Sequence, residues 1–163
     1  MILVEGLVVI NCNGIITEGR SKLGCGYVLQ DHTRRFIAGY ISNLGGCSML
    51  VEELKTILLD LQFTWSKGYR RICINSDSQL IIRLPALGCC NSHPYFNIMK
   101  SIHNVHNNSK RVIWNHVLKK TNQPVDRLAM YALLANYDFH VFHFAHIFVI
   151  HKLIIYVTQT CFP

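Results

Sequence analysis

Three strand-like segments precede any helical pattern in this chain, and this order constrains the fold more than any other feature. Residues 3–12, 23–31 and 34–42 are rich in Val, Ile, Leu, Tyr and Phe and are bounded by glycines and polar turns. From residue 48 to 67 the apolar residues recur at helical spacing instead, with Gly68 as a stop signal. The pattern predicts a three-stranded antiparallel meander followed by a helix.

The second half of the chain alternates between the two periods. The sequence predicts a strand at residues 71–75 and then a helical stretch that Pro85 ends. A helix at residues 93–106, a strand at 111–118 and a last helix at 124–136 follow. Any parallel pair of strands in such an arrangement needs a helical crossover. We therefore expect an α/β fold with five strands in a mixed sheet that is flanked by helices.

Composition favours one globular domain with an acidic partner. The 163 residues are 50% hydrophobic and 15% charged, which suits a chain with a sizeable core. The net charge of +7 suits a polyanion such as nucleic acid. The Lys and Arg residues come as separate pairs rather than one long run, so ordinary solvated surface is the alternative interpretation.

The seven cysteines and the first residues bear on the compartment. The cysteines are odd in number and have no C-x-x-C spacing, which is typical of small buried side chains in a reducing environment. Residues 1–10 are apolar but carry Glu5 and no basic leader, so a buried strand explains them better than a signal peptide. We expect an intracellular protein, in the nucleus or cytoplasm, that is not secreted.

The last segment, residues 137–163, is apolar and aromatic. It is interrupted by His140, His143, His146, His151 and Lys152. These residues make a membrane span costly, so we expect no membrane insertion. The spacing of three among the first histidines offers a zinc site as an alternative, but no second cluster of Cys or His accompanies it.

Four short segments stand in a characteristic order along the chain. They are Asn11-Cys12-Asn13-Gly14, Glu52-Glu53-Leu54, Asn75-Ser76-Asp77-Ser78 and Asn122-Gln123-Pro124-Val125-Asp126-Arg127-Leu128-Ala129. Together they resemble the ribonuclease H family, most closely its plant, retrotransposon-related group, whose motifs run N-x-D-G, A-E-L, E-S-D-S and N-x-x-A-D-x-L-A. The resemblance implies a ribonuclease H-like fold with the first strand central and the fourth parallel beside it.

The resemblance also implies an activity and a cofactor. Family members hydrolyse the RNA strand of RNA–DNA hybrids with two Mg²⁺ ions, or Mn²⁺ in their place, held by carboxylates. Carried over residue by residue, Glu53, Asp77 and Asp126 would be metal ligands. His116 would match the family histidine that assists proton transfer or product release.

Each of these residues has a structural alternative. Glu53 lies at the edge of the apolar stripe beside Glu52, where an exposed helical acid is common. Asp77 with Ser78 also suits a helix N-cap, and Asp126 near a helix start is favoured by the macrodipole. His116, between Trp114 and Val117, also suits a structural role in a strand. Their joint order and spacing favour the functional interpretation.

Two positions carry an amide where the family motifs have an acid. Asn13 stands where the first catalytic Asp is expected, and an amide supplies one neutral oxygen where two metal ions need negative charge. Asn75 replaces the acid of E-S-D-S. We therefore expect hydrolysis to be weakened or lost while nucleic-acid binding persists.

The combined prediction is a nucleic-acid-binding ribonuclease H-like domain at residues 1–136, with residues 137–163 as a His-rich tail packed on it, as in plant members. By position, Asn11, Gly14, Ser78 and Asn122 would contact an RNA–DNA hybrid or RNA. We expect a monomer. The alternatives are an active endoribonuclease H and a non-enzymatic interaction domain or decaying gene product.

Overall fold

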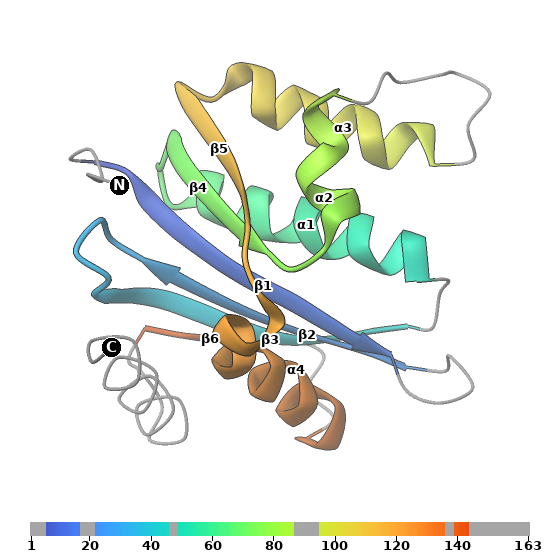
Figure 1. Ribbon diagram of the computed structural model, residues 1–163. Helices are drawn as coiled ribbons and strands as arrows, with labels where there is room; N and C mark the ends of the chain where they lie inside the picture. Colours follow the sequence, from blue (N-terminus) through green and yellow to red (C-terminus); the bar gives the residue numbers. More distant parts are fainter. Residues whose placement is uncertain (1–5, 17–21, 46–48, 87–94, 136–138, 144–163) are drawn as a thin grey trace.

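A single six-stranded sheet with helices on both faces forms the protein (Figure 1). The computed structural model describes residues 6–16, 22–45, 49–86, 95–135 and 139–143. The strands are β1 (Val8–Ile16), β2 (Lys22–Gln30), β3 (Phe36–Gly45), β4 (Arg71–Ser76), β5 (Arg111–His116) and β6 (Phe139–Phe142). The helices are α1 (Met49–Ser66), α2 (Gln79–Arg83), α3 (Phe96–Asn108) and α4 (Gln123–Ala135), with 3₁₀ turns η2 (Leu84–Ala86) and η3 (Lys119–Asn122).

The strand order is β5-β4-β1-β2-β3-β6. The first three strands form the predicted antiparallel meander, and β4 and β5 add to β1 in parallel. The expected α/β fold, with β1 central and β4 parallel beside it, is therefore confirmed.

The strand count needs a correction, because the sheet has six strands rather than five. Phe139–Phe142 was assigned to the tail, but it pairs antiparallel with β3 as β6. The tail at residues 144–163 lies outside the described residues.

The first strand also ends later than its apolar residues predict. It continues past residue 12 to Ile16, since Gly14 to Ile16 pair with β2. Asn13 therefore lies inside β1 rather than after it.

The two faces of the sheet carry different helices, with α1, α2 and α3 on one side and α4 on the other (Figure 1). The main core lies under the first group and includes Ile10, Leu54, Leu61 and Ile74. None of the helices in the described ranges is long and apolar enough to cross a membrane.

Glycines in β2 let α4 approach the sheet closely. A methyl group on Gly26 would lie 2.5 Å from the Val125 carbonyl oxygen and 2.8 Å from the Ala129 backbone nitrogen. Only a residue without a side chain leaves room for the helix backbone there. This close packing sets the start of α4, which carries Asp126, against β1.

Candidate active site

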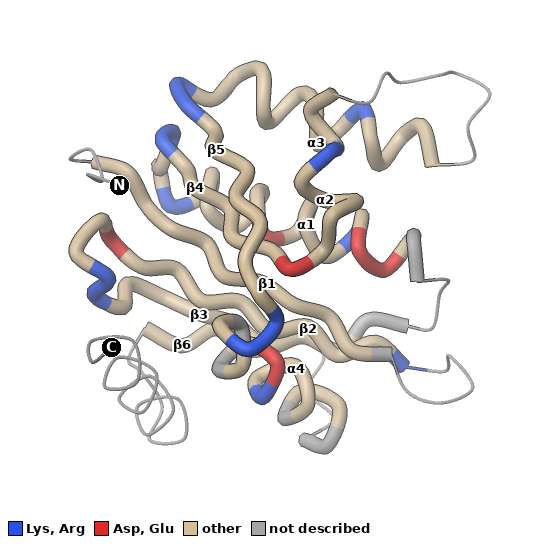
Figure 2. Tube along the Cα trace, viewed as in Figure 1, with Lys and Arg blue, Asp and Glu red and all other residues tan. Residues whose placement is uncertain are grey.

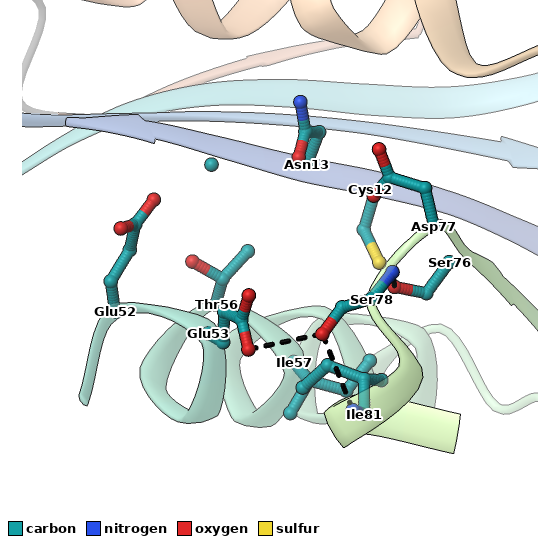
Figure 3. Close-up of a pocket in the computed structure, with 11 residues that line it drawn as sticks. Cys12, Asn13, Glu52, Glu53, Thr56, Ile57, Ser76, Asp77, Ser78 and Ile81 are labelled. Atoms are coloured by element: carbon teal, nitrogen blue, oxygen red, sulfur yellow. Dashed lines mark hydrogen bonds between the residues drawn. The ribbon is translucent and has the colours of Figure 1, made fainter. Parts of the chain in front are cut away.

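A pocket of about 290 Å³ opens between β1, the start of α1 and the turn after β4 (Figure 3). Its described lining residues are Cys12, Asn13, Gly14, Glu52, Glu53, Thr56, Ile57, Ser76, Asp77, Ser78 and Ile81. Three of the four motif segments therefore meet around one cavity. This is the carboxyl end of the parallel pair β1 and β4, where open α/β sheets usually bind ligands.

Asn13 connects the pocket to the fourth segment. Its Nδ2 donates a short hydrogen bond to Asp126 Oδ1 on α4. Burial and the nearby charge of Asp77 raise the pKa of Asp126, while the Asn13 hydrogen bond and Lys119 act in the opposite direction. Asn13 therefore places an amide where the family motif has an acid. This amide donates to the Asp126 carboxylate, which a second acid at position 13 would repel.

Glu53 and Ser78 hold the turn after β4 against α1. Ser78 is the N-cap of α2, and its Oγ donates to Glu53 Oε2 at 3.0 Å and accepts from the Ile81 N–H at 3.4 Å (Figure 3). Glu53 is half-buried and faces the pocket rather than bulk solvent. The structure thus brings Glu53 and Ser78 together, as the motif order suggests.

His116 ends β5 next to this turn. Its Nε2 lies 3.2 Å from the Asp77 carbonyl oxygen, to which the Nε2–H tautomer donates. The side chain is exposed and does not line the pocket. His116 is therefore beside Asp77 but contacts its backbone rather than its carboxylate.

Asn11 lies away from the pocket, in a row of amides across four strands. Asn115 donates to Asn75 at 2.9 Å, Asn75 to Asn11 at 3.1 Å, and Asn11 to Gln30 at 3.0 Å. Asn122 ends η3, and its side chain is outside the described part of the chain. Of the four predicted nucleic-acid contacts, Gly14 and Ser78 therefore border the pocket, and Asn11 does not.

Glu52 is the site residue that sequence reasoning missed. It is only 6% exposed and lines the pocket from the first turn of α1. Burial, and then the charge of Glu53, raises its pKa to about 7. The signal was available in the spacing, because polar residues recur every four positions from Glu52 along the side of α1 that faces the sheet.

Acidic residues line the pocket, and no Lys or Arg is among its described lining residues. Figure 2 shows acids at the start of α1, directly after β4 and on α4, with Lys and Arg spread over the strand ends and the helices. The basic pair Lys119–Lys120 lies in the turn just before α4, the helix that carries Asp126, and both side chains are exposed.

The acids do not fit a two-metal centre in this arrangement. Within the described ranges, no three His, Cys, Asp or Glu side chains lie close enough together to hold a metal ion. Glu53 and Asp126 each accept a hydrogen bond from a neighbouring side chain, and Asn13 adds no negative charge. Two closely spaced divalent ions need bridging carboxylates, which this set lacks.

Comparisons with known proteins identify the family. Residues 11–132 match the model of the reverse transcriptase-like family. The chain belongs to this family of ribonuclease H-like domains. An Arabidopsis thaliana protein named as a candidate ribonuclease H is 30% identical over 137 residues, which are 84% of this chain. The chain spans only 22% of the length of that relative.

Solved structures confirm the ribonuclease H fold. Ribonuclease H1 of Halobacterium salinarum superposes with a TM-score of 0.71 at 20% identity, covering 79% of this chain and 98% of that one. LC11 ribonuclease H1, solved in complex with an RNA/DNA hybrid, gives a TM-score of 0.69 at 16% identity with the same coverage. At these identities the likeness establishes the fold of the present chain and not its activity.

Proposed function

We propose that this reverse transcriptase-like domain binds nucleic acid, with RNA–DNA hybrids as its ligand class, and that its hydrolytic activity is weak or lost. The observation that carries the proposal is the hydrogen bond from Asn13 to Asp126. This hydrogen bond engages the side chains of Asn13 and Asp126 with each other. The family resemblance implies two metal-binding carboxylates at these two positions.

Hybrid binding is supported by the fold and by the pocket. The family match covers all four motif segments, and a structural neighbour is solved with an RNA/DNA hybrid. Gly14 and Ser78 border the pocket, and Lys119 and Lys120 are exposed beside it. Backbone contacts of this kind recognise the shape of a hybrid rather than its sequence.

Loss of activity is supported by the donor set. Mg²⁺ and Mn²⁺ bind hard, charged oxygens, and the amide of Asn13 replaces such a ligand with a neutral one. In this proposal Glu53, Asp77 and Asp126 retain the family positions, but they hold a pair of these ions too weakly for catalysis. Each 1.4 kcal/mol of lost transition-state stabilisation lowers the rate about tenfold.

The decisive experiment compares wild type with Asn13→Asp on one labelled RNA–DNA duplex, with Mg²⁺ and with Mn²⁺. Cleavage by Asn13→Asp alone supports a ribonuclease site that is silenced at one side chain. Cleavage by wild type would instead establish an active endoribonuclease H. No cleavage by either protein would mean that differences other than Asn13 also prevent hydrolysis.

Hybrid binding is measured separately, by fluorescence anisotropy in EDTA across a salt series. We expect wild-type affinity to fall steeply with salt, because bound Lys and Arg release counterions from phosphates. The double variant Lys119→Gln with Lys120→Gln should bind less tightly and with a shallower salt slope. No affinity at any salt concentration would favour the alternative of a protein-interaction domain.

A further inference from the structure

Basic pairs that are separate in the sequence meet at one end of the sheet. Arg71 opens β4 and Arg111 opens β5, and these two residues are partners in the parallel register. The residues before them are also adjacent, since the Lys110 N–H donates to the Arg70 carbonyl oxygen at 2.9 Å. Strand pairing therefore places two basic pairs from distant parts of the chain side by side.

The turn between β2 and β3 brings a third basic pair to the same end. Strand β2 runs antiparallel to β1 and finishes beside Val9, near the point where β4 begins. Arg34 and Arg35 in the following turn therefore lie at the end of the sheet where β4 and β5 start (Figure 2). Arg71 lies between the two groups, because a methyl group on Gly6, just before β1, would be 3.7 Å from its Nη1.

The basic edge is the set of exposed cations at this end, namely Arg34, Arg35, Arg71, Lys110 and Arg111. Arg70 is not included, because its guanidinium stacks on Trp65 and donates to the Trp65 carbonyl oxygen. Neighbouring strands lie about 4.8 Å apart, so the span from β5 to β3 is roughly 19 Å. Strand β4 rises about 3.3 Å per residue over its six residues, so the pocket at its other end is roughly 20 Å away.

Little negative charge compensates the basic edge within the described ranges. Asp31 is the one acid there, and its Oδ1 accepts from the N–H groups of Thr33 and Arg35 at 2.8 and 2.9 Å. The acids of the pocket are too distant to compensate it, because the Debye length is about 8 Å at physiological salt. Like charges side by side on neighbouring strands, as at Arg71 and Arg111, destabilise a sheet. A bound anion would relieve this repulsion.

The composition of the basic edge favours phosphate groups as that anion. All but one of its cations are Arg, whose planar guanidinium binds phosphate through two parallel hydrogen bonds. A protein partner usually also needs an apolar centre to its interface. The large apolar side chains that are exposed in the described part of the chain are Leu118, Met130 and Phe139, and none of them belongs to this end of the sheet.

We propose that the basic edge binds the phosphate backbone of a single nucleic-acid strand, at a second site that is separate from the pocket. A single strand is flexible enough to follow a line of cations, and such binding needs no groove and no particular base sequence. This site goes beyond the hybrid binding proposed above, because it requires neither a hybrid nor a metal ion.

The test measures anisotropy of a labelled oligothymidylate, of about 12 nucleotides, with the full chain in EDTA. Arg71→Gln with Arg111→Gln should weaken binding about tenfold and lower the salt slope by about 1.4, since each phosphate contact contributes about 0.7. Lys55→Gln with Lys100→Gln is the matched control, because it removes the same charge from exposed positions on α1 and α3. The control should bind within about twofold of wild type. An equal loss in the control would overturn the proposal.

A second pair of substitutions keeps the proposal testable if the strand variant fails to fold. Arg34→Gln with Arg35→Gln changes only exposed side chains of the turn and should also weaken binding about tenfold. Unchanged affinity in this variant would contradict an edge that extends from β5 to β3. Poly-glutamate tests for an acidic protein partner, and displacement of the oligothymidylate at equal charge concentration would rule out a phosphate site.

The two proposed binding sites can fail separately. A wild-type chain that binds the RNA–DNA hybrid but no oligothymidylate, even at low salt, would overturn the basic edge alone. Binding of oligothymidylate without binding of the hybrid would support the basic edge and overturn the proposed function.

Discussion

Restoring the family acid with Asn13→Asp should destabilise the metal-free protein. The variant loses the amide donor that binds Asp126 and places a second carboxylate against it. The pKa of Asp126 is already raised by burial and by Asp77, so a further negative charge finds little compensation there. We therefore expect a lower free energy of unfolding in EDTA, most strongly above neutral pH, where both acids are ionised.

The size of the effect follows from two contributions. A hydrogen bond to a charged acceptor contributes about 1.5–3 kcal/mol. Repulsion between two carboxylates about 4 Å apart costs between about 1 and 4 kcal/mol, depending on the local dielectric. Asp126 is half-buried, and solvent screening places the repulsion in the lower part of that range. The expected loss is therefore about 2.5–5 kcal/mol, a large part of the usual 5–15 kcal/mol of a domain.

Urea unfolding followed by tryptophan fluorescence measures this loss, at pH 8 in EDTA. The matched control is the swapped pair, Asn13→Asp with Asp126→Asn, which recreates one amide and one carboxylate in the reverse order. Its stability should return to within about 1 kcal/mol of wild type. Equal stability of Asn13→Asp and wild type in EDTA would refute the reasoning.

Two further predictions concern packing and buried charge. Gly26→Ala should lower the free energy of unfolding by about 3 kcal/mol, because the added methyl group meets backbone atoms of α4 that cannot rotate away; thermal unfolding measures it, and an unchanged Tm would contradict the close packing. Burial raises the pKa of Asp60 to about 7, above its unfolded value, so wild type should lose stability as pH rises from about 4 to about 7. Asp60→Asn should remove this pH dependence of the free energy of unfolding, which amounts to on the order of 4 kcal/mol. Urea unfolding across this pH range measures it, and a pH dependence that persists in the variant would point to other groups.

Helix α1 shows how much of the fold local patterns determine. The predicted range 48–67 differs by one residue at each end from Met49–Ser66. Apolar spacing and a glycine stop are local signals that act within one element. The last helix, predicted at 124–136 and found at Gln123–Ala135, agrees equally well for the same reason.

Long-range pairing set what local patterns could not. Strand β6 has four residues and exists because β3 offers a free edge, which is information that its own sequence does not contain. The C-terminal half of β1 is likewise fixed by β2. Among the acids, the motif assigned a role to Glu53 and none to Glu52, whereas Glu52 is the more buried of the two, under the β1 backbone at Gly14.

The two acid-to-amide departures from the family motifs have the same physical consequence. Asn13 and Asn75 each replace an acid with an amide, and each amide both removes a negative charge and supplies a donor that a neighbouring strand or helix uses. An acid at position 13 would repel Asp126 and would need a cation to hold β1 and α4 together. Here the Asn13 amide hydrogen-bonds across that junction, so under the proposed function the substitution that weakens metal binding also removes the structural need for the metal. Under the proposed function, the chain can in this way lose hydrolysis and still keep the fold and the surface that a hybrid would contact.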